Sequence, residues 1–478
     1  MSFKNVLILM SDEHAGRVLG CAGHPLVRTP NIDRLAASGT RFSAAYTNSP
    51  ICIPARAAFA TGRYPSDIDC WDNATPYGGH PPSWGHALRE AGIPSFSIGK
   101  LHYRNAEDDT GFTEQILPMH VVDGVGDVLG SVRDPLPVRT KSKAVATEIG
   151  PGESSYTEYD RRVTDAACGW LKNRGRGGPW TLFVGWVAPH FPLIAPRAFY
   201  DLYDPASIPL PKASAPEAWP AHPWLDALRE CFITDRFHTD ETRRIALASY
   251  LGLVSFMDDH VGRVLAALDH SGAAADTLVI YASDHGDNMG ARGLWGKSTM
   301  YEESAGIPMI LSGGGIPSAT ATTPVSLVDV YPTLLHAYGL ASRPGLRGAS
   351  LIGTARDAPR DTRRAAFAEY HAAGAASAAF MIRQDRYKYV HYVGMPPQLF
   401  DLAADPEELD DLAGRPEHAS VLQALHGELL RQVDPVEVDR RARAQQQALV
   451  ARHGGRDAVV GRGGFGATPP PGHAPKYA

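Results

Sequence analysis

The chain has 478 residues, with 46 Lys or Arg and 52 Asp or Glu, so its formal net charge is −6. Hydrophobic residues make up 44% and charged residues 21%, which is typical of a globular protein and excludes disorder as the main state. A mildly acidic chain gives no reason to expect a nucleic-acid partner. The five cysteines are scattered and include no Cys-x-x-Cys pair, so we expect neither a disulfide framework nor a structural zinc site.

No apolar run is long enough to span a bilayer, and the first residues lead directly into a short apolar strand rather than a signal peptide. We therefore expect a cytoplasmic protein without membrane contact. The first 300 residues alternate short apolar runs with amphipathic segments, which predicts a mostly parallel sheet covered by helices on both faces. The strands are predicted at residues 5–10, 94–98, 181–187 and 277–282, and the helices at 83–91, 241–268 and from Pro30 to a stop at Gly39.

The pattern changes after about residue 360. Four short alternating runs predict an antiparallel meander, at residues 365–370, 379–383, 387–392 and 398–402, and a helix near residues 420–433 follows. From Gly454 the chain is rich in Gly and Pro, which predicts an extended tail. The expected organisation is a large α/β domain over residues 1–360, a small α+β domain over 361–433 and an extension over 434–478. We expect this extension to contact a neighbouring subunit in a homo-oligomer.

Acidic residues follow two of the predicted strands. Asp12 and Glu13 follow the first, and Asp284 and His285 follow the strand at residues 277–282. In an open α/β sheet, ligands bind beyond the carboxyl ends of the strands, where these residues would meet. Either pair alone is explained as well by capping of the next segment, but together they favour a divalent metal site.

A second group of candidate residues lies between residues 51 and 63. Pro54 is predicted to be the first residue of a helix that runs to Ala60, which puts Cys52 at the amino end of that helix. Free backbone N–H groups there favour anions, and Arg56 lies one turn further on. The residues alone thus suggest a reactive cysteine near an anion site, with a small buried packing residue as the alternative.

The sequence from Cys52 through Pro54 and Arg56 to Thr61 and Gly62 resembles the signature of the type I sulfatases in the alkaline phosphatase superfamily. Further segments occur in that family's order: 29–33, 99–102, 189–192, 283–286, 296–302 and 399–407. The resemblance implies an alkaline-phosphatase-like α/β fold. It also implies that a separate maturation enzyme oxidises Cys52 to formylglycine, whose hydrate is the nucleophile and forms a covalent hemiacetal with sulfate.

The resemblance also assigns roles to other residues. Asp12, Asp284 and His285 would hold one divalent cation together with residue 52, and Arg56 would hold the formylglycine hydrate. The remaining roles fall to residues around the sulfate: Lys100 and His102, which flank the nucleophile and help to expel sulfate; His190 and Lys297, which grip the sulfuryl oxygens near the leaving group; and Asn73, which matches an Asn of the choline-sulfatase and phosphonate hydrolase branches. His190 is our candidate general acid, with Lys297 as the alternative.

Two departures from the arylsulfatase pattern bear on chemistry. Glu13 stands where many arylsulfatases have Asp, which leaves its part in the metal shell open. The pair Asp284-His285 resembles the choline-sulfatase and phosphonate monoester hydrolase branches, and the imidazole slightly favours Mn²⁺ over Ca²⁺.

The expected function is hydrolysis of sulfate monoesters, either aryl or small alkyl esters such as choline sulfate, by a promiscuous enzyme. Lys100 and His102 favour sulfatase activity over the alternative, a phosphonate monoester or phosphodiester hydrolase on the same scaffold. A non-catalytic anion-binding relative with an unmodified Cys52 is the third interpretation. We expect a dimer or tetramer.

Overall fold

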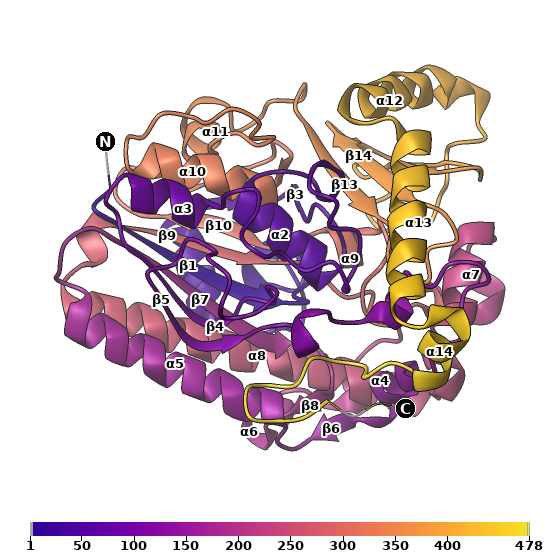
Figure 1. The fold of residues 1–478 in the computed structure, drawn as a ribbon, viewed down its shortest axis with the longest axis horizontal. Coiled ribbons are helices and arrows are strands. Elements are labelled where there is room, and N and C mark those ends of the chain that lie inside the picture. Colours follow the sequence, from indigo (N-terminus) through magenta and orange to yellow (C-terminus); the bar gives the residue numbers. More distant parts are fainter. Residues whose placement is uncertain (1–2, 476, 478) are drawn as a thin grey trace.

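A computed structural model describes residues 3–475 and residue 477. Its centre is an eight-stranded sheet in the order β11-β2-β10-β9-β1-β7-β4-β5 (Figure 1). The strands are β1 (Asn5–Asp12), β2 (Gly39–Phe42), β4 (Ser95–Lys100), β5 (Glu114–Met119), β7 (Trp180–Pro189), β9 (Thr277–Ser283), β10 (Met309–Ser312) and β11 (Ala319–Ala321). β1, β4, β5, β7 and β9 run parallel, whereas β10 is antiparallel to β9 and β2. The mostly parallel sheet predicted from the sequence is confirmed.

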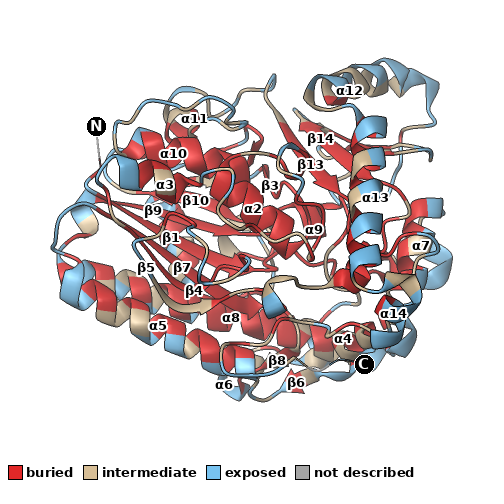
Figure 2. Ribbon diagram, in the orientation of Figure 1, coloured by how far each residue is buried: buried red, intermediate tan, exposed pale blue. Residues whose placement is uncertain are grey.

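The central strand β1 shows why the sheet is buried on both faces. Val6, Ile8 and Met10 join the core on one side, and Leu7 and Leu9 join the core on the other. Successive side chains of a strand point to opposite faces, so an unbroken apolar run needs cover on both. Figure 2 shows β1 in the colour of buried residues along its length.

Helices supply that cover. One face packs against α1 (Pro30–Ala37), α5 (Ser155–Arg174) and α8 (Asp240–Ser271), and the other against α2 (Cys52–Thr61), α3 (Trp84–Glu90), α10 (Val330–Ala337) and α11 (Leu351–Asp357). Shorter elements lie around this core: β3 (Ala45–Tyr46), β6 (Ile149–Pro151), β8 (Leu193–Ala195), β12 (Val325–Ser326), α4 (Ala144–Thr147), α6 (Arg197–Tyr200), α7 (Pro223–Cys231) and α9 (Glu302–Ala305). Among the described residues, no helix combines the length and the apolarity needed to cross a bilayer.

A second, antiparallel sheet follows the main one. Its strands β13 (Ala365–Tyr370), β14 (Ala379–Gln384), β15 (Tyr387–Tyr392) and β16 (Gln398–Asp401) pair in chain order, and α12 (Ala419–Gln432) packs against them. The four strands and the helix lie where the alternating pattern predicts them, within two residues at each end.

The C-terminal segment differs from expectation. It forms α13 (Pro435–Arg452) and α14 (Gly455–Arg462), so the prediction of an extended tail from Gly454 is wrong for residues 455–462. The helix α14 buries Val459 against Leu449 and Val450, and this small apolar contact outweighs the flanking glycines. After α14, residues 463–475 form no helix or strand and return along the molecule towards β8, as the yellow ribbon of Figure 1 shows.

Candidate active site

The acidic residues predicted to meet at one sheet edge do so. Ser11 of β1 lies in register with Ser283 of the adjacent β9, so Asp12 and Asp284 leave neighbouring strands together. The backbone N–H of Glu13 donates to Asp284 Oδ1 over 3.2 Å. Glu13 has a φ of 68°, a left-handed conformation that few non-glycine residues adopt. This turn directs the chain away from the strand immediately after Asp12.

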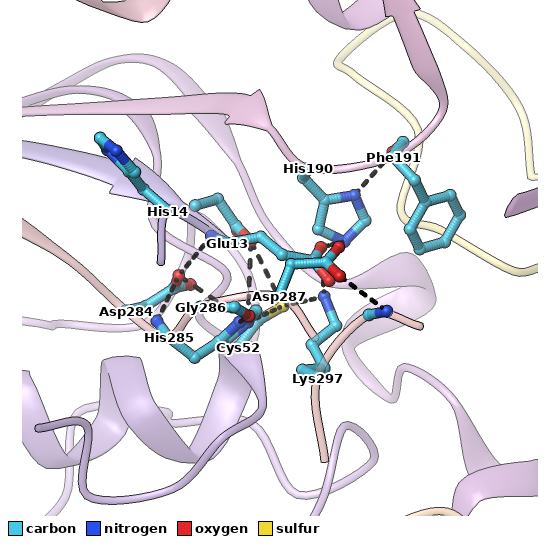
Figure 3. Close-up of polar contacts among 12 residues, drawn as sticks. Glu13, His14, Cys52, His190, Phe191, Asp284, His285, Gly286, Asp287 and Lys297 are labelled. Carbon is cyan, nitrogen blue, oxygen red and sulfur yellow. Dashed lines mark hydrogen bonds and ion pairs between the residues drawn. The ribbon is translucent and has the colours of Figure 1, made fainter. Parts of the chain in front are cut away.

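Cys52 is the first residue of α2, with Ile51 as the cap, so the helix begins two residues before Pro54. The expected position of Cys52 at the amino end of the helix is thus confirmed, while Pro54 as the first helical residue is corrected. Backbone N–H groups in the first turn of a helix have no partner within the helix, so the N–H that proline lacks is not missed there. Pro54 is therefore as acceptable at the third helical position as at the first. The Cys52 side chain is fully buried and directed into the acidic cluster (Figure 3).

Four buried side chains form a group that could hold a metal ion. Ligand atoms of Asp12, Cys52, Asp284 and His285 all lie within 4.8 Å of one another. His285 Nδ1 is 3.0 Å from the Gly286 carbonyl oxygen and therefore carries the proton. This leaves the Nε2 lone pair facing Cys52 Sγ at 3.2 Å. Two carboxylates and an imidazole nitrogen without a proton suit a divalent cation.

Two buried cations neutralise these carboxylates from the side. Arg56 places Nε 2.8 Å from Asp284 Oδ2 and Nη2 3.2 Å from Asp12 Oδ2. Lys100 Nζ lies 2.5 Å from the same oxygen of Asp12. Burial alone would raise the pKa of Asp12, but Lys100, His190 and Arg56 hold it well below its ordinary value. Asp12 is therefore ionised, and its Oδ1 remains directed towards Cys52, 3.7 Å from Sγ.

Glu13 belongs to a neighbouring group. Its Oε2 is 2.9 Å from Lys297 Nζ and 3.4 Å from His190 Nε2, while its buried Oε1 has no hydrogen-bond partner among the described residues. Burial raises the pKa of Glu13 to about 7. The Glu13 carboxylate thus lies beside the Lys297 ammonium group and the His190 imidazole rather than beside Asp284. Its part in the metal shell stays open.

Cys52 itself is a poor nucleophile as a thiol. Burial, together with the charge of Asp12, raises its pKa to about 12. The thiolate is the reactive form of cysteine, and this environment suppresses it at neutral pH. The reactive-cysteine interpretation drawn from the residues alone stays a prediction.

The other predicted residues line one cavity of about 60 Å³ over Cys52. They are Asn73, Lys100, His102, His190 and Lys297. Lys297 Nζ is 3.4 Å from Cys52 Sγ, and Asn73 Oδ1 accepts the backbone N–H of Ile53 over 3.2 Å. Burial and the charge of Lys100 hold the pKa of His102 well below its ordinary value, so this ring is neutral. The structure thus brings every predicted site residue to one place.

Several residues of the site escaped the sequence analysis. Asp287 accepts the N–H of Gly296, and Asn288 donates to the carbonyl oxygens of Gly296 and Lys297, so together they hold the loop that carries Lys297. They directly follow the 283–286 motif, which was the available signal. Phe191 also lines the cavity and belongs to the 189–192 motif, whereas the lining residues Asp127, Tyr156 and 465–468 had no such signal.

The sulfatase family model matches residues 4–340, and a model described as N-sulphoglucosamine sulphohydrolase, C-terminal, matches residues 290–434. The chain belongs to the sulfatase family. This sulfatase is a hydrolase that acts on sulfuric ester bonds.

Individual relatives include members of the two branches that the sequence motifs resemble, the choline-sulfatases and the phosphonate monoester hydrolases. A choline-sulfatase of Rhizobium meliloti (strain 1021) is 32% identical over 438 residues, covering 86% of this chain and 83% of the relative. Arylsulfatase K of Danio rerio is 29% identical over 436 residues, covering 86% and 80%. Among solved structures, the phosphonate monoester hydrolase of Agrobacterium radiobacter has a TM-score of 0.74 at 26% identity and covers 93% of this chain and 96% of its own. The expected fold and superfamily are thereby confirmed.

Proposed function

We propose that this sulfatase hydrolyses sulfate monoesters with formylglycine at position 52 and one divalent cation, Mn²⁺ or Ca²⁺. The observation that carries the proposal is the position of Cys52. Its side chain is buried at the first turn of α2, among Asp12, Asp284 and His285, with Lys297 3.4 Å from its sulfur. A side chain that only packs has no reason to lie at the centre of so many buried charges.

Asp12, Asp284 and His285 fit a divalent cation because their donor atoms converge and because Arg56 and Lys100 bind only the far oxygens of the two carboxylates. The bound cation would supply positive charge at the reacting oxygens. A separate maturation enzyme would oxidise Cys52 to formylglycine. One hydroxyl of its hydrate would serve as the nucleophile towards sulfur as the S–O bond to the alcohol breaks, and the other would allow sulfate to be expelled and the aldehyde restored.

The other residues of the cavity act on the sulfate and the leaving group. Lys100 and Lys297 both line the cavity over residue 52, where their charges would stabilise the negative charge that builds on the sulfuryl oxygens. Asn73 uses its Oδ1 on Ile53 N–H, so its amide N–H groups remain for an oxygen in the cavity. Our proposed donor of a proton to the departing alcohol is His190, with Lys297 as the alternative, because both side chains line the cavity.

A second cavity of about 110 Å³ adjoins the first and shares Asn73, Asp127, Phe191, Lys297 and Gly466 with it. Phe232 and Trp295 add aromatic walls. A space of this size accepts a small alcohol or a single aromatic ring. We therefore assign it to the leaving group and propose small alkyl or aryl sulfates, with choline sulfate among them, as the substrate class.

Hydrolysis of phosphonate monoesters or phosphate diesters is the second candidate. It is favoured by the pair Asp284-His285 and by the likeness to the Agrobacterium radiobacter phosphonate monoester hydrolase. The same cationic cavity would serve a phosphoryl centre, so we propose this as a side activity. The presence of Lys100 and His102 favours sulfate as the main substrate.

The experiment compares kcat/KM for an aryl sulfate and for the matching aryl phosphonate on one preparation, since that ratio reports transition-state binding. We expect sulfate to be preferred. A preference for the phosphonate would move the protein to the second candidate. Cys52→Ser serves as the inactive control, and Cys70→Ser, at a buried cysteine that lies outside both cavities, serves as the matched active one. Size-exclusion chromatography with light scattering on the same preparation tests the proposed dimer or tetramer.

A further inference from the structure

The helix α13, from the C-terminal segment, contacts the loop that carries Asn73. Gln445 Oε1 accepts the indole N–H of Trp71 over 2.7 Å, and Gln446 Nε2 donates to Asp72 Oδ2 over 2.7 Å. These contacts join residues 374 positions apart in the sequence. Gln446 is 1% exposed and Asp72 is fully buried, so the contact is shielded from water.

Gln446 uses its whole amide at this position. Its Nε2 also donates to the His371 carbonyl oxygen over 2.8 Å, and its Oε1 accepts Arg133 Nε over 3.0 Å. A buried glutamine whose amide hydrogens and oxygen are all hydrogen-bonded is held in one orientation. It is therefore a rigid support for whatever it binds.

Asp72 connects Gln446 to the loop that carries Asn73. Its Oδ2 also accepts the hydroxyl of Ser131 over 2.7 Å, and its Oδ1 accepts the backbone N–H of Ala74 over 2.9 Å. These bonds fix the turn from residue 72 to residue 74, and with it the residue between them. Asn73 in turn accepts Ile53 N–H with its side chain and Asp127 N–H with its carbonyl oxygen.

We propose that Gln446 is a positioning residue, which holds Asp72 and through it sets the side chain of Asn73 against the first turn of α2 and the leaving-group cavity. The inference rests on the proposed function only for its kinetic readout. It makes α13 part of the catalytic apparatus of its own chain, in addition to any contact it makes with a neighbouring subunit.

The test is a double-mutant cycle of Gln446→Met and Asn73→Ala on full-length protein, with hydrolysis of an aryl sulfate as the readout. Misplacement of a substrate-contacting group by about 1 Å can cost about 100-fold in rate, so we expect Gln446→Met to lower kcat/KM by about 10- to 100-fold. In the Asn73→Ala background the same substitution should change kcat/KM by less than about twofold, because the residue it positions is gone. Equal losses in both backgrounds would overturn the proposal.

Controls separate positioning from simple destabilisation. Gln447→Met, at the next and exposed position of α13, should leave kcat/KM unchanged. Ser131→Ala removes the other donor to Asp72 Oδ2 without leaving a large cavity, and it should lower kcat/KM in the same direction but less. If Gln446→Met is folded and its kcat/KM is unchanged, the proposal is overturned. If Gln446→Met does not fold, an unchanged kcat/KM in Ser131→Ala overturns it.

A failure of the proposed function would be recognised in the wild-type protein, as absence of sulfate ester hydrolysis. The same cycle would then be run on the affinity for inorganic sulfate, measured by titration calorimetry. A Gln446→Met effect that disappears in the Asn73→Ala background supports the inference there as well, and an additive effect contradicts it.

Discussion

Lys388 on β15 offers a direct measure of how a buried ion pair stabilises this fold near the site. Its side chain is fully buried, and Nζ lies 2.7 Å from both Glu302 Oε1 and Glu408 Oε1 and 2.9 Å from the Met300 carbonyl oxygen. The ion pair between Lys388 and Glu302 connects the second sheet to the segment that follows Lys297. We predict that Lys388→Met lowers the free energy of unfolding by about 3–5 kcal/mol at neutral pH. The substitution removes the cation beside the buried Glu408 and leaves Glu302 with only the longer contact to Arg17, 3.5 Å.

The pKa of Glu302 supports a similar magnitude. Burial would raise it, but Lys388 and Arg17 lower it from 4.5 to about 2. At about 1.4 kcal/mol per pKa unit, the combined effect of these partners corresponds to about 3.5 kcal/mol. Burial raises the pKa of Glu408 instead, so the pair is mainly with Glu302. Because the folded-state pKa lies below the unfolded one, this stabilisation is complete above about pH 4.5 and is lost as the pH falls towards 2.

The assay is urea unfolding of wild type and Lys388→Met at several values between pH 7 and pH 3. The stability difference should be largest at pH 7 and should shrink below about pH 4.5. Arg440→Met, which breaks the exposed pair with Glu437 on α13, is the control and should cost less than about 1 kcal/mol. A difference for Lys388→Met below about 1 kcal/mol, or one that does not change with pH, would refute the reasoning.

Three further predictions concern catalysis. Dialysis against a chelator should abolish hydrolysis, and Mn²⁺ or Ca²⁺ should restore it; unchanged rates after complete metal removal would contradict the metal assignment. Asp284→Asn should weaken the measured affinity for that cation by at least about 10- to 100-fold, the loss typical of residues that only support a ligand, because it removes a ligand charge. An unchanged dissociation constant would remove Asp284 from the ligand set. His190→Asn should lower kcat more for an alkyl sulfate than for a 4-nitrophenyl sulfate, because the poorer leaving group needs the proton more. If Lys297→Met shows that pattern instead, Lys297 is the general acid.

The sequence alone supports much of the fold because the fold follows local patterns. The apolar run of residues 5–10 and the polar residues after it predict both a buried strand and a site at its end. The same reasoning applied to Asp284 places the two acidic groups together, as the register of β1 and β9 confirms. Cys52 was located by its motif, and its burial follows from α2, all of whose residues are buried.

Contacts between distant side chains have no such pattern. Gln446 lies in a polar stretch of α13 in which nothing distinguishes it from the exposed Gln447. Its contact with Asp72 depends on how α13 packs against the loop after α2, which periodicity does not describe. The helix α14 was not predicted because the 25 residues from Gly454 are rich in Gly and Pro as a whole. That average composition conceals the short stretch whose Val459 packs against Leu449 and Val450.

The central claim is that residue 52 acts as formylglycine, and mass spectrometry of the peptide that contains it tests this most directly. The peptide should come from protein whose hydrolysis of an aryl sulfate has been measured, prepared with and without a co-expressed maturation enzyme. The account predicts an aldehyde at position 52 in a fraction that rises in proportion to kcat. An unmodified Cys52 in fully active protein would contradict it.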